Sequence, residues 1–170
     1  MGTCGRILLV LENAFAGEGN LMRFEDVLVP VDFSPNSVRA IEFAMSLVEP
    51  DGEVYLLHVI DSDFVGRLSG QGFADAEGAT SKMRQKAEAE FQELINGLPE
   101  ARPKVESMIV VGKPFAEILR VASDLDFQII VIGTHGIRGE KIEELLFGST
   151  AEKVLRGTRV PVICVPDPVL

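Results

Sequence analysis

Five short apolar runs, each rich in β-branched residues, alternate along this chain with segments whose apolar residues recur at helical spacing. Apolar runs of this length are typical of buried strands, and strict alternation of strand and helix indicates a parallel sheet with right-handed crossovers. We therefore predict an α/β fold: a single doubly wound, five-stranded parallel sheet with helices on both faces. The predicted strands are Phe24–Asp32, Val54–Ile60, Val105–Val111, Gln128–Ile132 and Val160–Val165.

The segments between these strands carry helix start and stop signals. Ser34-Pro35 is predicted to be an N-cap and first helical residue, and the turn residues Pro50-Asp51-Gly52 are predicted to end that helix. The stretch Asp61–Gly78 contains four glycines, which predicts a loop. The later helices are predicted to begin at Thr80 or Ser81, at Pro114 and at Ser149, and the last of them to end at Arg156.

The formal net charge of −10 limits the classes of partner. Proteins that bind nucleic acids need a basic surface that displaces counterions, and anionic membranes attract basic segments, so neither partner is expected. No apolar run approaches the roughly 20 residues needed to span a bilayer. A small anionic ligand remains compatible with the charge, because local main-chain dipoles can outweigh the field of the whole protein.

The two cysteines, Cys4 and Cys164, do not suggest a disulfide framework. Cys164 lies in an apolar run and is expected to fill space in the core. These features favour a reducing, cytoplasmic location. The first convincing strand begins after Met22, so residues 1–22 are predicted to be an appendage outside a single domain of residues 23–167.

The passage that points most directly to function is Gly133-Thr134-His135-Gly136, followed after eleven residues by Gly148-Ser149-Thr150. Its first half follows a predicted strand, and its second half opens the last predicted helix. The main-chain N–H groups of a glycine-rich turn and of a helix N-terminus can converge on an anion. The sequence therefore predicts a site for a phosphate group at this corner.

The predicted sheet has the strand order 3-2-1-4-5. In open sheets of this class, ligands bind beyond the carboxyl ends of the strands, where the direction of winding reverses. Asp32 follows the first strand and Gly133 follows the fourth. In this order the two residues are neighbours at the reversal, which is where we expect a ligand.

Five motifs follow the predicted strands in a fixed order along the chain. They are Val29-Pro30-Val31-Asp32-Phe33-Ser34, Leu57-His58-Val59, Val111-Gly112-Lys113-Pro114, Val131-Ile132-Gly133-Thr134-His135-Gly136, and Gly148-Ser149-Thr150-Ala151-Glu152-Lys153-Val154 with the following Val160-Pro161-Val162. On these motifs, the chain from about Phe24 to Pro166 resembles the universal stress protein family.

The resemblance implies a domain that binds ATP or AMP, with or without Mg²⁺, and that forms a homodimer through the strand Val160–Val165. ATP-binding members of the family carry the pattern Gly-x2-Gly-x9-Gly-Ser/Thr. Here eleven residues, 137–147, fill the second gap, so two are extra. An added turn at Glu140-Lys141 could bulge outward and leave Gly148 in place, or it could close over the phosphate pocket.

By the same resemblance, the Asp32 carboxylate lies beside the nucleoside end of the ligand and the Val59 main chain contacts the adenine edge. Arg138 and Lys141 are candidate phosphate contacts. The full set of expected nucleotide-binding residues is Pro30, Asp32, Val59, Gly133, Thr134, His135, Gly136, Gly148, Ser149 and Thr150.

Each of these roles has a plainer alternative. The glycines either let the main chain approach a phosphate or simply supply turn conformations. Ser149 either donates to a phosphate or is an ordinary N-cap, and Asp32 either contacts the ligand or caps a helix. His58 ends a buried strand and is expected to be a core residue whose polar atoms are satisfied.

No catalytic set accompanies these residues. The sequence has no Gly-x4-Gly-Lys-Ser/Thr loop, no Gly-x-Ser-x-Gly elbow and no Cys/His cluster, so we expect neither an enzyme nor a metal held by side chains. The expected function is a regulatory stress-response module. Two alternatives stay open: a nucleotide-free member that works through dimerisation, and a weak ATP-hydrolysing or adenylating enzyme on the same fold.

Overall fold

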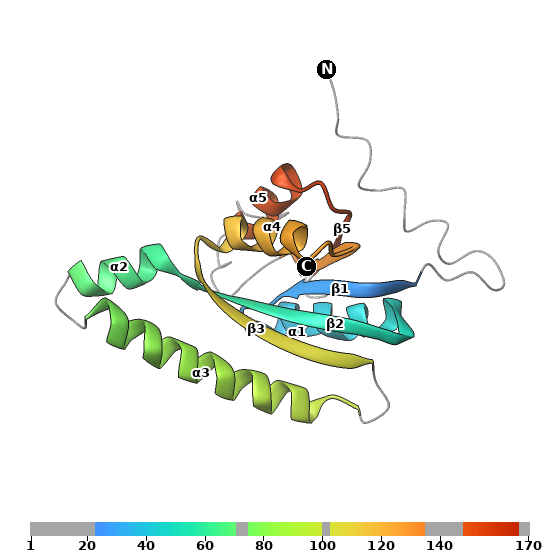
Figure 1. The fold of residues 1–170 in the computed structure, drawn as a ribbon, viewed down its shortest axis with the longest axis horizontal. Helices are drawn as coiled ribbons and strands as arrows, with labels where there is room; N and C mark the ends of the chain where they lie inside the picture. Colours follow the sequence, from blue (N-terminus) through green and yellow to red (C-terminus); the bar gives the residue numbers. More distant parts are fainter. Residues whose placement is uncertain (1–22, 71–74, 100–102, 135–147, 167–170) are drawn as a thin grey trace, which may run out of the picture.

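The computed structural model describes residues 23–70, 75–99, 103–134 and 148–166. Five parallel strands form one sheet in the order β3-β2-β1-β4-β5, which confirms the predicted fold class and strand order (Figure 1). The strands are β1 Phe24–Pro30, β2 Val48–Asp61, β3 Lys104–Gly112, β4 Ile129–Gly133 and β5 Val162–Val165. The helices are α1 Pro35–Leu47, α2 Ser62–Gly70, α3 Ala76–Gly97, α4 Pro114–Asp124 and α5 Ser149–Gly157.

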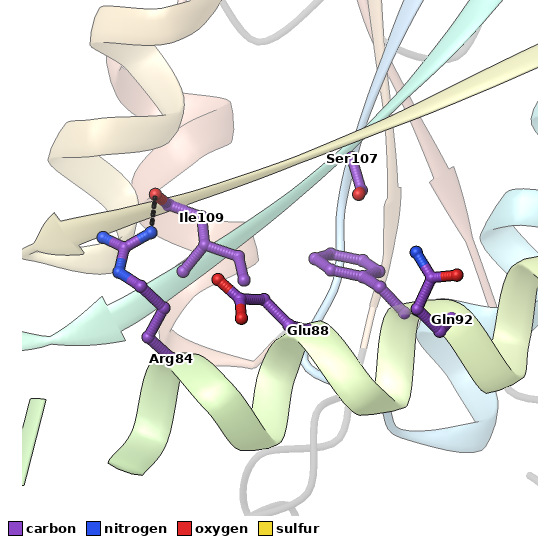
Figure 2. Close-up of a pocket in the computed structure, with 6 residues that line it drawn as sticks. Arg84, Glu88, Gln92, Ser107 and Ile109 are labelled. Carbon is purple, nitrogen blue, oxygen red and sulfur yellow. Dashed lines mark hydrogen bonds between the residues drawn. The ribbon is translucent and has the colours of Figure 1, made fainter. Parts of the chain in front are cut away.

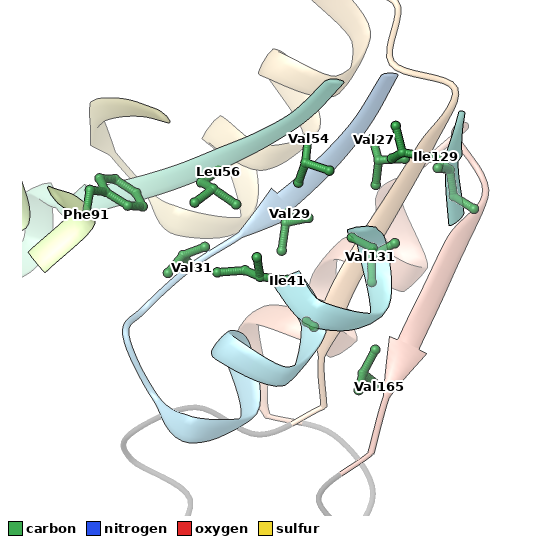
Figure 3. Close-up of a cluster of buried hydrophobic side chains, with 13 residues drawn as sticks. Val27, Val29, Val31, Ile41, Val54, Leu56, Phe91, Ile129, Val131 and Val165 are labelled. Carbon is green, nitrogen blue, oxygen red and sulfur yellow. The ribbon is translucent and has the colours of Figure 1, made fainter. Parts of the chain in front are cut away.

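The helices divide between the two faces of the sheet (Figure 1). Alternate residues of a strand point to opposite faces, so β1 supplies Val27 and Val29 to one core and Leu28 to the other. The first core packs against α1 and α3, where Ile41 and Phe91 are buried (Figure 3). The second core packs against α4 and α5. Both faces of the central strands are therefore apolar, as the continuous hydrophobic runs predicted.

The predicted turn at Pro50-Asp51-Gly52 is wrong, because β2 begins at Val48 and includes these residues. The pairing of β1 with β2 jumps from Phe24↔Val48 to Asp26↔Glu53, so the extra residues form a bulge in β2. A bulge tolerates proline, and glycine fits where another strand approaches closely. A Cβ on Gly52 would collide with the Glu25 carbonyl oxygen.

The predicted loop at Asp61–Gly78 is also wrong over most of the described part of that stretch. α2 starts directly after β2, and the Asp61 carboxylate accepts a hydrogen bond from the Asp63 N–H at 2.9 Å. Val65 is buried against Ile60 and Ala79, and this packing offsets the low helix propensity of the glycines. Tertiary burial has outweighed local propensity here.

The long third helix begins earlier than Thr80 or Ser81. Asp75 is its N-cap, and its carboxylate accepts a hydrogen bond from the Gly78 N–H at 2.5 Å. Thr80 lies inside the helix, where its hydroxyl donates to the Ala76 carbonyl at 2.7 Å. The start signals at Ser34-Pro35 and Pro114 are confirmed. Within the described residues, no helix is both long enough and apolar enough to cross a bilayer.

Candidate functional site

The reversal of winding lies between β1 and β4, at the centre of the sheet. These two strands pair at Val27↔Ile129 and Leu28↔Ile130. Beyond those pairs the chain leaves β1 through Asp32 into α1, and leaves β4 through Gly133. The predicted neighbours therefore follow adjacent strands at the carboxyl edge, where a ligand of a doubly wound sheet binds.

Gly133 lies against the first turn of α1. A Cβ at this position would come within 3.1 Å of the main-chain carbonyl group and side-chain amide of Asn36, a residue that is only 4% exposed. The glycine therefore permits close packing between the end of β4 and the start of α1. Sequence reasoning missed Asn36, because nothing in the local pattern distinguishes it from an ordinary helix residue.

The main chain of Thr134 joins three elements at this corner. Its N–H donates to the Val165 carbonyl at the end of β5 at 3.0 Å, and its carbonyl accepts from the Gly148 N–H at 2.6 Å. The start of α5 is thus tied to the end of β4. The two ends of the glycine-rich passage meet, although the segment between Gly136 and Gly148 is two residues longer than in the family pattern.

The N-terminus of α5 has no side-chain cap. Gly148 occupies the N-cap position with φ −62° and ψ 154°, so it is not a glycine required by a positive φ. Ser149 is the first helical residue and is exposed, which shows that its interpretation as the N-cap was wrong. The first N–H groups of a helix have no partner within the helix, so this end can donate to an anion.

Asp32 follows β1 and is half-buried. Its Oδ1 accepts a hydrogen bond from the Ser34 N–H at 3.1 Å, so the carboxylate stabilises the turn into α1. Ser34 in turn caps α1, because its hydroxyl oxygen accepts from the Ser37 N–H at 3.2 Å. Asp32 is therefore not itself the N-cap of α1, a position that Ser34 occupies, and its contact with a nucleoside stays a prediction.

Val59 lies where β1 and β2 separate. The paired residues of these strands end at Pro30↔Leu57, and the Val31 N–H adds one bond to the Leu57 carbonyl at 2.8 Å. Main-chain groups alternate sides along a strand, so those of Val59 point to the same side as those of Leu57, toward β1. In the described chain no β1 residue pairs with Val59. Its N–H and C=O therefore point to the side of β2 where β1 has ended.

His58 is bonded as the sequence predicted for a core residue. Its Nδ1 lies 2.8 Å from the Val31 carbonyl oxygen, and its ring packs 4.9 Å from that of Phe33. Phe33 has a φ of 63°, an uncommon conformation for a residue with a bulky side chain. Sequence reasoning did not single out Phe33, because a positive φ on a non-glycine residue leaves no trace in the sequence.

The profile of the Universal stress protein family matches residues 23–166, which is most of the chain. The chain belongs to this family. Universal stress protein MJ0531 of Methanocaldococcus jannaschii is 30% identical over 151 residues, which are 85% of this chain and 84% of that protein. Universal stress protein MJ0577 of the same organism is 30% identical over 155 residues, covering 84% of this chain and 94% of that one.

Solved structures of universal stress proteins have the same fold. The structure of MJ0577 superposes with a TM-score of 0.74 at 29% identity, covering 86% of this chain and 99% of that chain. A universal stress protein in complex with cAMP superposes with a TM-score of 0.54 at 18% identity, covering 85% and 98%. Because the identity to the cAMP complex is only 18%, that similarity shows only a shared fold.

Four of the expected site residues of this universal stress protein lie outside the described residues. They are His135, Gly136, Arg138 and Lys141. Of the others, the structure brings Gly133, Thr134 and Gly148 into one corner and puts Asp32 after the adjacent strand. The described ranges contain no group of three or more His, Cys, Asp or Glu side chains arranged to hold a metal ion.

A separate hollow of about 220 Å³ lies between α3 and the edge strand β3 (Figure 2). Arg84 crosses it and donates from Nη1 to the Ile109 carbonyl oxygen at 3.2 Å. An edge strand has main-chain groups with no partner strand, and a long basic side chain is one way of covering them. Because β3 is two strands away from β1, this hollow does not lie at the reversal of winding between β1 and β4.

Proposed function

We propose that this universal stress protein binds an adenine nucleotide, ATP or AMP, in the crevice between β1 and β4 and acts as a nucleotide-responsive regulatory domain. The observation that carries the proposal is the hydrogen bond from the Gly148 N–H to the Thr134 carbonyl. It holds the N-terminus of α5, with no side chain at the N-cap position, beside the end of β4.

The chemistry of the crevice suits the two ends of a nucleotide. The main-chain N–H groups of Ser149 and Thr150 and the Ser149 hydroxyl are donors for phosphate oxygens. At the other end, the N–H and C=O of Val59 offer the complementary pair that an adenine edge requires. The Asp32 carboxylate accepts hydrogen bonds and suits the hydroxyl groups of a ribose. Pro30 is the last residue of β1, two residues before Asp32.

A bound Mg²⁺ would be held chiefly by phosphate oxygens and water, as is usual for this ion, and would neutralise part of the phosphate charge. One solved protein of this fold holds cAMP, so the fold accommodates an adenine nucleotide. Several charge-assisted hydrogen bonds of about 1.5–3 kcal/mol each are sufficient for micromolar affinity. We propose no turnover, because the roles proposed for Asp32 and Ser149, the described polar side chains of this site, are to bind the ribose and the phosphate.

The proposal includes a homodimer formed through β5 and a cytoplasmic location. β5 is an edge strand of the sheet, and its short apolar sequence has no charged residue to discourage pairing. Burial raises the pKa of the Cys164 thiol to about 11. The thiol is therefore protonated near neutral pH, which suits a cysteine that fills space in the sheet.

Calorimetric titration of the full chain with ATP, AMP and adenosine tests the proposal. If the N-terminus of α5 receives the phosphates, affinity increases with the number of phosphate groups. Ser149→Asp puts a carboxylate at that end and weakens ATP binding by about tenfold or more through charge repulsion, while adenosine binding is retained. Ala76→Asp is the matched control, because it adds the same charge at the first position of α3.

The same titrations decide between the alternatives. A ligand present at a hundred times its dissociation constant adds about 2.7 kcal/mol of stability, or roughly 5–10 °C in melting temperature for a domain of this size. No shift with millimolar ATP, with or without magnesium, would indicate a nucleotide-free member of the family. Release of ADP or pyrophosphate that Ser149→Ala abolishes would instead indicate an enzyme.

A further inference from the structure

We propose that His58 is a positioning residue for the nucleotide site: it holds the residues on both sides of Asp32 and so fixes the bend that presents this carboxylate to the crevice. The inference rests on the proposed function for the identity of the ligand. It uses two contacts of the His58 side chain, with Val31 and with Phe33, and the absence of a hydrogen bond between Val59 and Val31 among the described residues.

The first contact is the hydrogen bond between His58 Nδ1 and the Val31 carbonyl oxygen at 2.8 Å. A carbonyl oxygen can only accept, so Nδ1 carries the proton in this arrangement. The Val31 N–H donates to the Leu57 carbonyl, also at 2.8 Å. Both main-chain polar groups of Val31 are therefore held by neighbouring residues of β2, and the residue before Asp32 is fixed.

The second contact holds the residue after Asp32. The rings of Phe33 and His58 are 4.9 Å apart and tilted by 39°, and the Phe33 ring meets that of Phe91 edge-on at 5.0 Å. Phe33 has a φ of 63°. A bulky residue keeps this conformation only where its surroundings impose it, and such residues gather at functional sites. The two aromatic neighbours impose it here.

The third observation concerns what the His58 bond replaces. In a continued parallel ladder, the Val31 carbonyl would accept from the Val59 N–H. The hydrogen bonds of the described residues contain no such bond, and the carbonyl accepts from the His58 side chain instead. The imidazole thus takes the partner that Val59 would have used. One side chain shapes the bend at Asp32 and leaves the Val59 main chain on the side of β2 where β1 has ended.

A test must distinguish this role from ordinary packing. His58→Asn keeps an N–H donor near the position of Nδ1 and loses the ring, whereas His58→Phe keeps a ring beside Phe33 and loses the donor. We expect His58→Phe, which loses the hydrogen bond to Val31, to weaken ATP binding by about tenfold, and His58→Asn, which loses only the ring contact with Phe33, to weaken it by no more than about threefold. Melting temperatures without ligand verify that both variants fold.

A double-mutant cycle with Asp32→Ala shows whether His58 acts through Asp32. If it does, His58→Phe changes ATP affinity by less than about twofold once the carboxylate is absent. Losses that multiply in the double variant, or wild-type ATP affinity in His58→Phe, would overturn the inference. A residue that merely stabilised the core would lower the melting temperature without this coupling.

A measurement without ligand separates this inference from the proposed function. The Ser34 N–H donates to Asp32, so its hydrogen exchange reports whether the bend is intact. We expect exchange at Ser34 to be faster by about tenfold in His58→Phe and little changed in His58→Asn. If the wild type binds no nucleotide, the proposed function fails, and the exchange rates still decide the role of His58: unchanged exchange in His58→Phe would refute it.

Discussion

The main-chain N–H of Gly148 donates to the carbonyl oxygen of Thr134 at 2.6 Å, although thirteen residues separate them in the sequence. This one bond brings the N-terminus of α5 to the end of β4. The position of the helix N-terminus therefore depends on the two ends of the intervening segment. Its length, which exceeds the family pattern by two residues, need not move the donors that would face a phosphate.

Shortening the segment between Thr134 and Gly148 tests whether the position of the α5 N-terminus is independent of the segment's length. We expect deletion of Glu143 and Glu144, which restores the spacing of the family pattern, to change the free energy of unfolding by less than about 0.5 kcal/mol, because loop-closure entropy depends only weakly on length. ATP affinity should stay within about threefold. Chemical denaturation and calorimetric titration measure the two quantities, and a loss of ATP binding would show that the extra length is itself part of the site.

Replacement of Gly133 by alanine tests the close packing between β4 and α1. The new Cβ would lie 3.1 Å from main-chain atoms of Asn36, which cannot move without shifting α1. We expect a loss of about 1–3 kcal/mol in unfolding free energy, the usual cost of overpacking. The shift of α1 should also weaken ATP binding, since the start of this helix follows Asp32.

Gly97→Ala is the matched control for this substitution. Gly97 is the last residue of α3, and a Cβ there meets no atom within 4 Å. The control should leave both stability and ATP affinity close to those of the wild type. Equal behaviour of the two alanine variants would mean that Gly133 does not have the packing role assigned to it.

The ionisation of Tyr55 reports on a cluster at the opposite end of the sheet. The Tyr55 hydroxyl donates to Glu53 Oε2 at 2.5 Å, and Lys104 Nζ donates to Glu53 Oε1 at 2.9 Å. The hydrogen bond to Glu53, followed by burial, raises the pKa of Tyr55 to about 12 from its ordinary 10.0. Because the folded protein binds this proton more tightly, the contribution to stability is complete below pH 10 and is lost as the pH rises toward 12.

The chain has a single tyrosine, so its ultraviolet titration measures this pKa directly. We expect Glu53→Gln to lower the midpoint toward 10. Glu106→Gln is the control. Glu106 pairs with Lys104 at 3.1 Å, and its substitution leaves the hydrogen bond between Tyr55 and Glu53 in place. A wild-type midpoint near 10 would refute the hydrogen bond as the cause.

Most element positions could be predicted from the sequence because they follow from periodic burial, whereas the strand order, although predicted correctly, does not follow from that pattern. At α2 and at the start of β2, where prediction failed, a tertiary contact decided the local structure. Val65 is buried against Ile60, which makes α2 helical despite its glycines, and the bulge opposite Phe24 takes Pro50 and Gly52 into β2. Neither the burial of Val65 nor the bulge in β2 can be derived from the residues that are adjacent in the sequence.

The candidate site also has some features that could be predicted from the sequence and others that could not. The positions of Asp32 and Gly133 after adjacent strands and the start of α5 at Ser149 were predicted, because strand and helix ends carry local sequence signals, while their contacts with a nucleotide stay predictions. The packing of Asn36 under Gly133 was not predicted, and neither was the conformation of Phe33. These features depend on how α1 and α3 approach the sheet, and the amino-acid pattern does not encode that approach locally.

The proposed dimer can be tested at the free edge of β5. The Pro161 and Val165 carbonyls accept hydrogen bonds from the N–H groups of Ile130 in β4 and of Thr134 just after it, at 2.9 and 3.0 Å, so the main-chain groups of these odd-numbered positions point toward β4. Those of Val162 and Cys164 therefore point away from the sheet. Val162→Pro removes one outward N–H and leaves the bonds to β4 in place, since proline is tolerated at the first residue of an edge strand.

We expect light scattering at micromolar concentration to give twice the chain mass of 18.5 kDa for the wild type and the single mass for Val162→Pro. Val162→Thr, which keeps the N–H and the branched shape, is the control and should remain dimeric. Monomeric wild-type protein would refute pairing through β5 without affecting the nucleotide site, because the crevice between β1 and β4 is formed by one chain. A dimer that persists in Val162→Pro would mean that the two copies meet through another surface.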